Sequence, residues 1–207
     1  MLFDHVIVRY GEIATKSGKV RSDMQNVLRQ RVENRLEYEE ISFSRVRESP
    51  GRIIVEKTVK EAHQALQNLP GVSSVSPAII TEPDIDKIIE EVLKIDLEDS
   101  FGVNTNRSGS HNFDSVEVNR KVGKAVEEEK DVYVDLDNPD TLVEVDLRKD
   151  EAYLFTQRFE GSNGLPVGSS ESLAALISGG IDSPVAAYEV MTRGCDILPI
   201  YFYNKPI

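Results

Sequence analysis

The strongest constraint on the fold lies near the end of the chain, where apolar runs flank a glycine-containing turn and a helix. Leu173–Ile177 is uninterruptedly apolar, which is typical of a strand buried in a parallel sheet. The hexapeptide Ser178–Ser183 (SGGIDS) follows directly, and a helix opened by a proline is predicted over Pro184–Arg193, with Gly194 ending it. Residues 197–202 form the next predicted strand. A strand–turn–helix–strand order predicts a parallel pair and places this part of the chain in the α/β class.

The turn itself has the chemistry of a phosphate-binding loop. Gly179 and Gly180 let the backbone approach a phosphate, and the free N–H groups of a helix start favour its negative charge. Ser178 and Ser183 add hydroxyl donors. The lysine of a Walker loop and the spacing of a dinucleotide turn are both missing. The hexapeptide resembles the SGGxDS signature of the PP-loop superfamily; the alternative is a plain joint between a strand and a helix.

The PP-loop resemblance implies a set of ATP-contacting residues. In that superfamily the loop holds the pyrophosphate part of ATP while a substrate oxygen attacks the α-phosphate, which gives an adenylate and releases pyrophosphate. It implies a catalytic role for Asp182 near the phosphates or their Mg²⁺, without a dedicated protein metal site. The residues expected to bind the cofactor are Leu176, Ile177, Ser178, Gly179, Gly180, Ile181, Asp182, Ser183, Tyr201 and Phe202.

Residues 1–77 are predicted to form a separate two-layer α+β domain. The apolar periodicity indicates helices over 20–37 and 59–69, between strands whose β-branched runs end at turn residues. The strands are predicted at 2–10, 41–46, 52–55 and 72–80. The resulting order, βαββαβ, is that of the ferredoxin-like split βαβ fold, in which helices cover one face of a sheet.

Residues 78–165 are predicted to form a second α/β domain. Asp84 and Asp114 are placed to cap two helices, the second of which runs over about 115–128. The strands are predicted at 101–104, 141–147 and 152–159, the last two as a hairpin. Residues 166–172 have the composition of an interdomain linker, and residues 173–207 form the truncated start of the third domain.

Several further segments carry a resemblance over the whole chain. An N-terminal signature is matched by Arg9–Ile13 with Lys16 and Arg21, and an RNA-binding THUMP segment by Gly109–Phe113 and Asn119–Gly123. The most specific matches are Asn138–Asp140, Phe159–Gly161, Gly164–Gly168 and the PP-loop. The chain therefore resembles the tRNA 4-thiouridine synthetase family, the tRNA sulfurtransferases (ThiI family).

This resemblance implies an enzyme that adenylates a tRNA uridine and replaces its oxygen with sulfur. ATP and Mg²⁺ are the implied cofactors. The implied partners are tRNA and a persulfide donor of the cysteine desulfurase type, and either a homodimer or a second chain completing the PP-loop domain is possible. A role in thiamine biosynthesis is also implied only by the resemblance.

The charge distribution limits where nucleic acid could bind. The formal net charge of −12 argues against RNA for the chain as a whole, because phosphate contacts need Lys and Arg. Residues 1–52 nevertheless carry 10 basic and 8 acidic side chains, and residues 105–130 carry 5 of each. The candidates for RNA binding are Lys16, Lys19, Arg21, Arg107, His111, Arg120, Lys121 and Lys124. For each of them an ordinary solvated position on a helix or loop stays open.

The numbers of cysteines and histidines limit which bonds, metal sites and sulfur-transfer reactions the chain can form by itself. Cys195 excludes an internal disulfide, and three scattered histidines give no zinc spacing. Persulfide transfer needs a second thiol, and Cys195 follows Gly194 beside an apolar strand, so we expect a small core residue. The absence of a signal peptide and of any run of about 18 apolar residues favours a cytoplasmic location.

The resemblance calls for a much longer PP-loop domain, so this chain alone is expected to be inactive in sulfur transfer. It is a piece of an enzyme, a truncated gene product or half of a split enzyme. Two other functions stay open: an RNA-binding module without complete catalysis, and a different adenylating PP-loop enzyme acting on a small molecule. Methyltransferases and deaminases with THUMP domains are disfavoured, because no methyltransferase or zinc pattern follows the linker.

Overall fold

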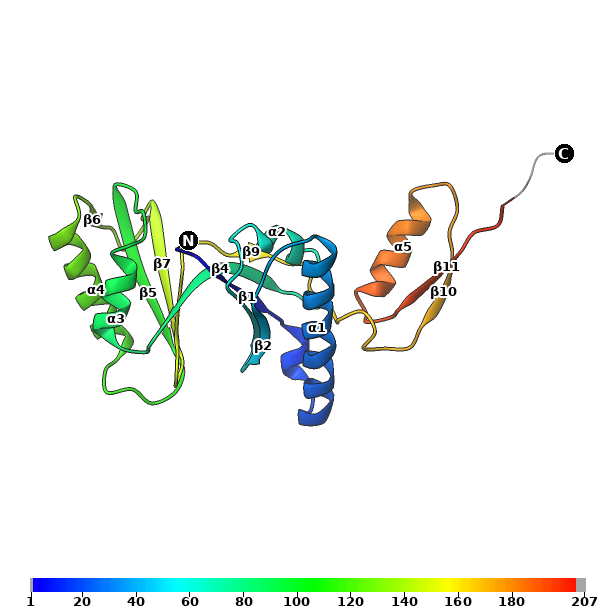
Figure 1. Cartoon of the computed structure of the whole chain (residues 1–207), viewed down its shortest axis with the longest axis horizontal. Coiled ribbons are helices and arrows are strands. Elements are labelled where there is room, and N and C mark those ends of the chain that lie inside the picture. The colour runs from blue at the N-terminus through cyan, green and yellow to red at the C-terminus, as the bar shows by residue number, and fades with distance from the viewer. Residues whose placement is uncertain (1, 204–207) are drawn as a thin grey trace. The chain divides into compact units, whose positions relative to one another are not determined.

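The computed structural model describes residues 2–203. They divide into two compact units (Figure 1). The first unit contains Val6–Val75 and the stretch from Phe159 onwards; the second contains the stretch up to His5 and Ser76–Arg158. Residues 204–207, the end of the domain predicted from residue 173, lie outside the described residues, as does Met1.

The first part of the first unit has the predicted ferredoxin-like fold. Its elements are β1 (His5–Arg9), η1 (Glu12–Thr15), α1 (Gly18–Tyr38), β2 (Arg45–Ser49), β3 (Arg52–Glu56), α2 (Ala62–Leu66) and β4 (Ser74–Thr81). The sheet order β2-β3-β1-β4 is the split βαβ topology. Leu28 and Val32 of α1 and Leu66 of α2 share one buried cluster with Val8 and Ile53. Because alternate strand residues share a face, both helices cover the same face of the sheet.

Several predicted element bounds in this part are wrong. The strand expected at 2–10 is β1, which covers only His5–Arg9. The strand expected at 41–46 is β2, which begins at Arg45 because its partner β3 ends opposite it at Glu56. The helix expected over 59–69 is shorter, because the first predicted residues form a turn in which the Ala62 N–H donates to the Val59 carbonyl.

The second unit is a mixed sheet covered by two helices. Its elements besides the end of β4 are α3 (Ile85–Val92), β5 (Ser100–Arg107), α4 (Ser115–Glu129), β6 (Tyr133–Val134), β7 (Thr141–Leu147) and β8 (Ala152–Phe155). The strand order is β4-β8-β7-β5-β6, with β5 parallel to both β6 and β7. Ile88 of α3 and Val122 of α4 pack in one cluster with Phe101 of the sheet.

Both predicted helix caps are confirmed. The Asp84 carboxylate accepts hydrogen bonds from the N–H groups of Asp86 and Lys87, and the Asp114 carboxylate accepts one from Glu117. Two strands differ from prediction. β5 continues to Arg107 because it pairs with all of β7, and the strand expected at 152–159 is divided into β8 and β9 (Phe159–Glu160), which pair with different parts of β4.

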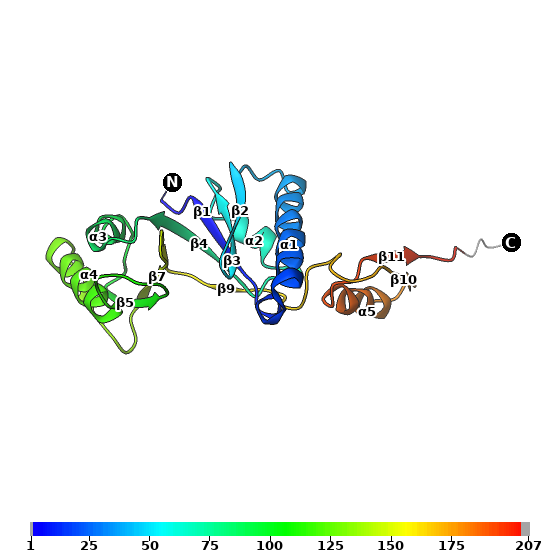
Figure 2. The same ribbon diagram turned by 90° about the horizontal axis from the view of Figure 1, so that it is seen from below.

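The last part of the chain forms the predicted parallel pair, β10 (Leu173–Leu176) and β11 (Ile197–Ile200), with α5 (Asp182–Met191) beside them (Figure 2). The expectation that the first strand is buried is wrong: Leu173 is 46% and Leu176 is 66% exposed. Two strands and one helix provide too few layers to cover both faces of the pair. The helix begins two residues before the predicted proline, and β11 ends at Ile200 rather than at residue 202.

No helix among residues 2–203 combines the length and the apolar character needed to cross a membrane.

Candidate functional site

The PP-loop is closed by its two serines at the start of α5. The Ser178 N–H donates to the Ser183 hydroxyl at 2.8 Å, and the two hydroxyl oxygens lie 3.0 Å apart. The Gly180 N–H donates to the Ser178 hydroxyl at 3.3 Å. These bonds join the segment after β10 to the first turn of the helix and fix the shape of the loop.

The glycines leave one side of this loop open. A Cβ added to Gly179 would meet nothing within 4 Å, and one added to Gly180 would meet only the Ser178 hydroxyl, at 3.6 Å. The N-terminal end of α5 has no side-chain cap, and Asp182 is in its first turn. An anion can therefore approach the loop backbone and the helix start together.

Four of the residues expected to bind ATP lie at one edge of the small sheet: Leu176, Ile177, Tyr201 and Phe202. Leu176 ends β10, and the Ile177 N–H donates to the Ile200 carbonyl of the neighbouring strand at 2.8 Å. Tyr201 and Phe202 follow that strand and are 63% and 77% exposed. The carboxyl ends of parallel strands are where open α/β sheets bind ligands, and the four residues lie there without a covering layer among the described residues.

The segment predicted as a linker is ordered and tied to its surroundings within the first unit. The Gly168 and Ser170 N–H groups both donate to the Gly194 carbonyl, at 2.8 and 2.9 Å. Arg31 of α1 donates from Nε to the Val167 carbonyl at 2.9 Å, and its Nη2 lies 3.3 Å from the Asp196 carboxylate. The PP-loop part is therefore attached to the ferredoxin-like part by specific bonds.

The candidate RNA-binding residues fall into two groups, one in each unit. Lys16, Lys19 and Arg21 surround the start of α1, where Lys19 and Arg21 are exposed and the Arg21 guanidinium donates to the Lys16 carbonyl at 2.9 Å. This group forms a small basic surface at the N-terminal end of the helix.

The second group lies on the β5–α4 loop and on α4. Arg107 donates to the Phe113 carbonyl at 2.9 Å and so shapes the loop, in which the His111 ring stacks on Phe113 with ring centres 5.6 Å apart. On α4, Lys121 pairs with Glu117 at 2.9 Å and Lys124 with Glu128 at 3.5 Å, and both are exposed. For Arg120 no ion pair is found among residues 2–203.

Two titrating groups near these surfaces are shifted. Burial raises the pKa of the Tyr10 hydroxyl above its ordinary value, against a hydrogen bond from Gln25 that lowers it. The backbone N–H groups of Asn138 and Asp137 hold the pKa of the Asp135 carboxyl below its ordinary value. Both shifts reflect fixed local structure.

The positions of Cys195 and of the potential metal ligands indicate neither a core residue nor a metal site. Cys195 is a free thiol just before β11 and is partly exposed, so the expected core position is not fully reached. Among residues 2–203 no three side chains of His, Cys, Asp or Glu are grouped as a metal site.

Three family models match consecutive parts of the chain. The ThiI ferredoxin-like domain matches residues 5–76, the THUMP domain matches residues 80–157, and the thiamine biosynthesis protein (ThiI) model matches residues 168–207.

Known proteins match nearly the whole chain. A probable tRNA sulfurtransferase of Methanosarcina acetivorans is 38% identical over 97% of this chain and 51% of its own length. The crystal structure of PH1313 from Pyrococcus horikoshii is 30% identical, with a TM-score of 0.86 over 98% of this chain and 69% of that one. A 4-thiouridine synthetase–RNA complex with bound ATP is 28% identical, with a TM-score of 0.80 over 98% of this chain and 53% of that one. The chain thus spans about half the length of the curated relatives it matches.

Proposed function

We propose that this chain, which belongs to the tRNA sulfurtransferase (ThiI) family, supplies the tRNA-binding domains and pyrophosphate loop of an enzyme that exchanges uridine oxygen for sulfur. The observation that carries the proposal is the succession of a ferredoxin-like fold, a THUMP match and a serine-closed SGGIDS loop in one chain. The enzyme would adenylate the uridine oxygen and then replace it with persulfide sulfur, which is 4-thiouridine synthesis.

The division of labour follows the proposed domains. Residues 1–77 and 78–165 would hold tRNA through its backbone, and 166–172 would link them to the ATP-binding domain that starts at residue 173. The remaining catalytic residues would come from a continuation of this chain, a homodimer partner or a second chain. A protein of the cysteine desulfurase type would donate the sulfur.

The loop residues fit the pyrophosphate part of ATP. Gly179 and Gly180 offer open backbone, and the hydroxyls of Ser178 and Ser183 lie at the same turn. ATP would supply the adenylyl group that activates the uridine oxygen. Asp182, in the first turn of α5, would hold Mg²⁺ together with the phosphates, because Mg²⁺ commonly takes one or two protein carboxylates plus phosphate oxygens.

The RNA part is tested by tRNA binding at several salt concentrations. A variant with Lys16, Arg21, Arg120 and Lys121 all changed to glutamine should bind more weakly. With each phosphate contact that is lost, fewer counterions are released from the RNA on binding, and their release favours the complex. The control changes two lysines, Lys87 and Lys94, to glutamine; they pair with Glu90 and Glu91 on or just after α3, and this variant should bind like the unaltered chain. A loss in the control about half that of the fourfold variant, in proportion to the two and four charges removed, would show that only net charge matters, and absence of binding by the unaltered chain would contradict the proposal.

The nucleotide part is tested by calorimetric titration with ATP and Mg²⁺. Gly179→Val places a branched side chain where the phosphates would approach and should abolish binding, whereas Val185→Ser on the exposed surface of α5 should not. Binding of tRNA without binding of ATP would favour the alternative of an RNA-binding module. The reverse result would favour an adenylating enzyme of small-molecule metabolism.

A further inference from the structure

The C-terminal end of α5, opposite the PP-loop, is held by the segment Leu165–Ser170, which we call the clamp. Its donors reach three consecutive carbonyls, those of Thr192, Arg193 and Gly194. The bonds run from the Leu165 N–H to Thr192 at 2.8 Å, from the Gly168 and Ser170 N–H groups to Gly194 at 2.8 and 2.9 Å, and from the Ser170 hydroxyl to Arg193 at 3.1 Å. Carbonyls at the C-terminus of a helix have no partner within it, so the clamp supplies donors that α5 lacks.

Two glycines allow the clamp to approach the helix end this closely. Gly164 precedes the clamp with a φ of +77°, and a Cβ there would collide with the Thr192 carbonyl oxygen. Gly194 has a φ of +89°, and a Cβ there would collide with the Ser169 hydroxyl. Both positions therefore favour glycine, for the positive φ and for the close approach. The segment is shaped for this contact and not for a flexible connection.

The clamp is fastened to the ferredoxin-like part at two points. Just before it, the Asn163 N–H donates to the Val72 carbonyl at 2.7 Å. In its middle, Arg31 of α1 donates from Nε to the Val167 carbonyl at 2.9 Å. A hollow of about 320 Å³ lies beside this second point, lined by Val20, Asp23, Met24 and Val27 of α1 and by Gly168 and Ser169 of the clamp. Because the clamp leaves that hollow unfilled, its position against α1 depends on the directed bond from Arg31.

The helix that joins the clamp to the PP-loop has little stability of its own. All ten residues of α5 are described, and none of them is buried. Helices shorter than about 12 residues are marginal in water unless other parts of the protein support them. The order of α5 therefore depends on the bonds at its two ends, the serine-closed loop and the clamp. Loss of the clamp should loosen the N–H groups that would receive a phosphate.

We propose that Arg31 is a positioning residue for ATP: it holds the clamp closed on one end of α5, and the closed clamp keeps the phosphate-binding end in shape. The inference rests on the proposed function and adds to it a control of the ATP site by the ferredoxin-like part. The ends of α5 are about 15 Å apart, at about 1.5 Å per residue, so Arg31 acts through the helix. If clamp closure strengthens ATP binding, bound ATP must strengthen clamp closure by the same factor.

The first measurement is calorimetric titration of the 207-residue chain with ATP and Mg²⁺. Arg31→Ala is compared with Arg29→Ala, a matched control on the same helix, because Arg29 bonds to Asn26 and Glu33 of α1 instead of to the clamp. Gly168→Ala changes the clamp itself, since its φ of +88° disfavours a side chain. None of these residues belongs to the PP-loop, and far-ultraviolet circular dichroism checks that the variants fold.

We expect Arg31→Ala and Gly168→Ala to bind ATP about fivefold more weakly, and Arg29→Ala to bind like the unaltered chain. A part with so little buried surface opens at a small cost in free energy, and the apparent affinity falls with the fraction in which the clamp is closed.

The second measurement is hydrogen exchange of the Leu165 and Gly168 amides, which lie at the end of α5 far from the loop. In the unaltered chain, ATP at ten times its dissociation constant should slow this exchange about tenfold and leave the amides of β1 unchanged. A purely structural role for Arg31 would produce no such response to the nucleotide.

The outcomes separate this inference from the proposed function. If the unaltered chain binds ATP and Arg31→Ala binds it as tightly as Arg29→Ala does, the positioning role is overturned while the proposed function stands. The same holds if ATP binds without slowing exchange of the clamp amides. If the unaltered chain binds no ATP, the nucleotide part of the proposed function fails and the role of Arg31 falls with it.

Discussion

Replacement of Arg31 by alanine should loosen the attachment of the PP-loop part to α1. The Nε–H donates to the Val167 carbonyl at 2.9 Å, and a hydrogen bond from a charged donor contributes about 1.5 kcal/mol at the lower end of its range. The contact of Nη2 with Asp196 is 3.3 Å long between side chains that are 38% and 54% exposed, so it adds about 0.5 kcal/mol. The combined loss is about 2 kcal/mol, or about 30-fold in the opening equilibrium.

The effect should be local rather than global. α5 has no fully buried residue, and two strands with one helix are marginally stable alone, so their order depends on this attachment. Hydrogen exchange of the Leu173 and Ile177 amides, which are bonded to the carbonyls of Asp196 and Ile200, reports on it directly. In Arg31→Ala both amides should exchange about 30-fold faster, while amides of β1 should keep their rates.

Two further variants separate the contribution of the Arg31–Val167 hydrogen bond from that of the Arg31–Asp196 ion pair. Asp196→Asn removes only the exposed ion pair and should accelerate exchange by no more than about fivefold, whereas Arg31→Lys keeps the charge but loses the directed Nε–H. The lysine variant should therefore behave more like alanine than like the unaltered chain. Unchanged exchange in Arg31→Ala, or an Asp196→Asn effect as large as that of alanine, would refute this account of the junction.

Three more outcomes follow from the structure. Asp84→Ala removes the acceptor for two N–H groups at the start of α3 and should cost about 1 kcal/mol in urea unfolding; an effect below 0.3 kcal/mol, about the error of such measurements, would contradict the cap. Gly164→Ala would place a Cβ against the Thr192 carbonyl oxygen at a φ of +77°, so its melting temperature should fall well below that of Gly179→Ala, whose Cβ meets nothing within 4 Å. Because folding raises the pKa of Tyr10, the folded state holds that proton more tightly. Its contribution to stability is present below about pH 10 and is lost as the pH rises through the folded pKa; Tyr10→Phe should show a smaller loss of unfolding free energy there.

Local rules predicted the helix starts and the hairpin of the second unit from sequence. Asp84 and Asp114 cap their helices because a cap needs only a carboxylate two or three residues before the N–H groups it accepts from. The strict alternation of Thr141–Leu147 defined β7 with its observed ends. Such features depend on neighbours in the chain, so sequence contains what determines them.

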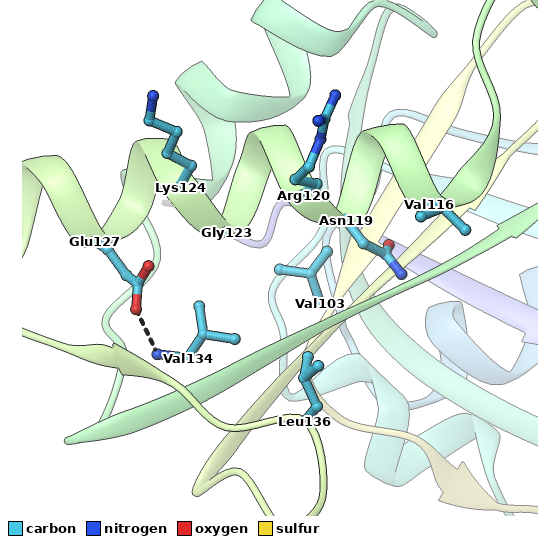
Figure 3. Close-up of a pocket in the computed structure, with 9 residues that line it drawn as sticks. All are labelled: Val103, Val116, Asn119, Arg120, Gly123, Lys124, Glu127, Val134 and Leu136. Atoms are coloured by element: carbon cyan, nitrogen blue, oxygen red, sulfur yellow. Dashed lines mark hydrogen bonds between the residues drawn. The ribbon is translucent and has the colours of Figure 1, made fainter.

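Features that depend on distant partners were missed. The break between β8 and β9 follows from their pairing with different parts of β4, and the exposure of Leu176 follows from the number of layers around β10; neither is encoded in the local apolar pattern. A groove in the second unit is lined by Val116 of α4 and by Leu136, which follows β6, so it joins residues twenty positions apart across Gly123 (Figure 3). The nearest sequence indication was Val116 itself, an apolar side chain beside the positions that pack α4 into the core.

The negative charge of the chain and its proposed RNA binding are compatible, but only over a limited range of salt. A net charge of −12 repels RNA over a distance set by the Debye length, about 30 Å at 0.01 M salt and about 8 Å at physiological ionic strength. At physiological salt, carboxylates outside the basic surfaces are screened from the phosphates, while Arg120 and Lys124 would act at contact distance. At low salt the repulsion between the acidic chain and the RNA is no longer screened. At high salt the contacts between cations and phosphates weaken, because the release of counterions from the RNA then favours binding less. Affinity for tRNA should therefore pass through a maximum at intermediate salt, and the limb above that maximum is the one whose slope measures the number of phosphate contacts.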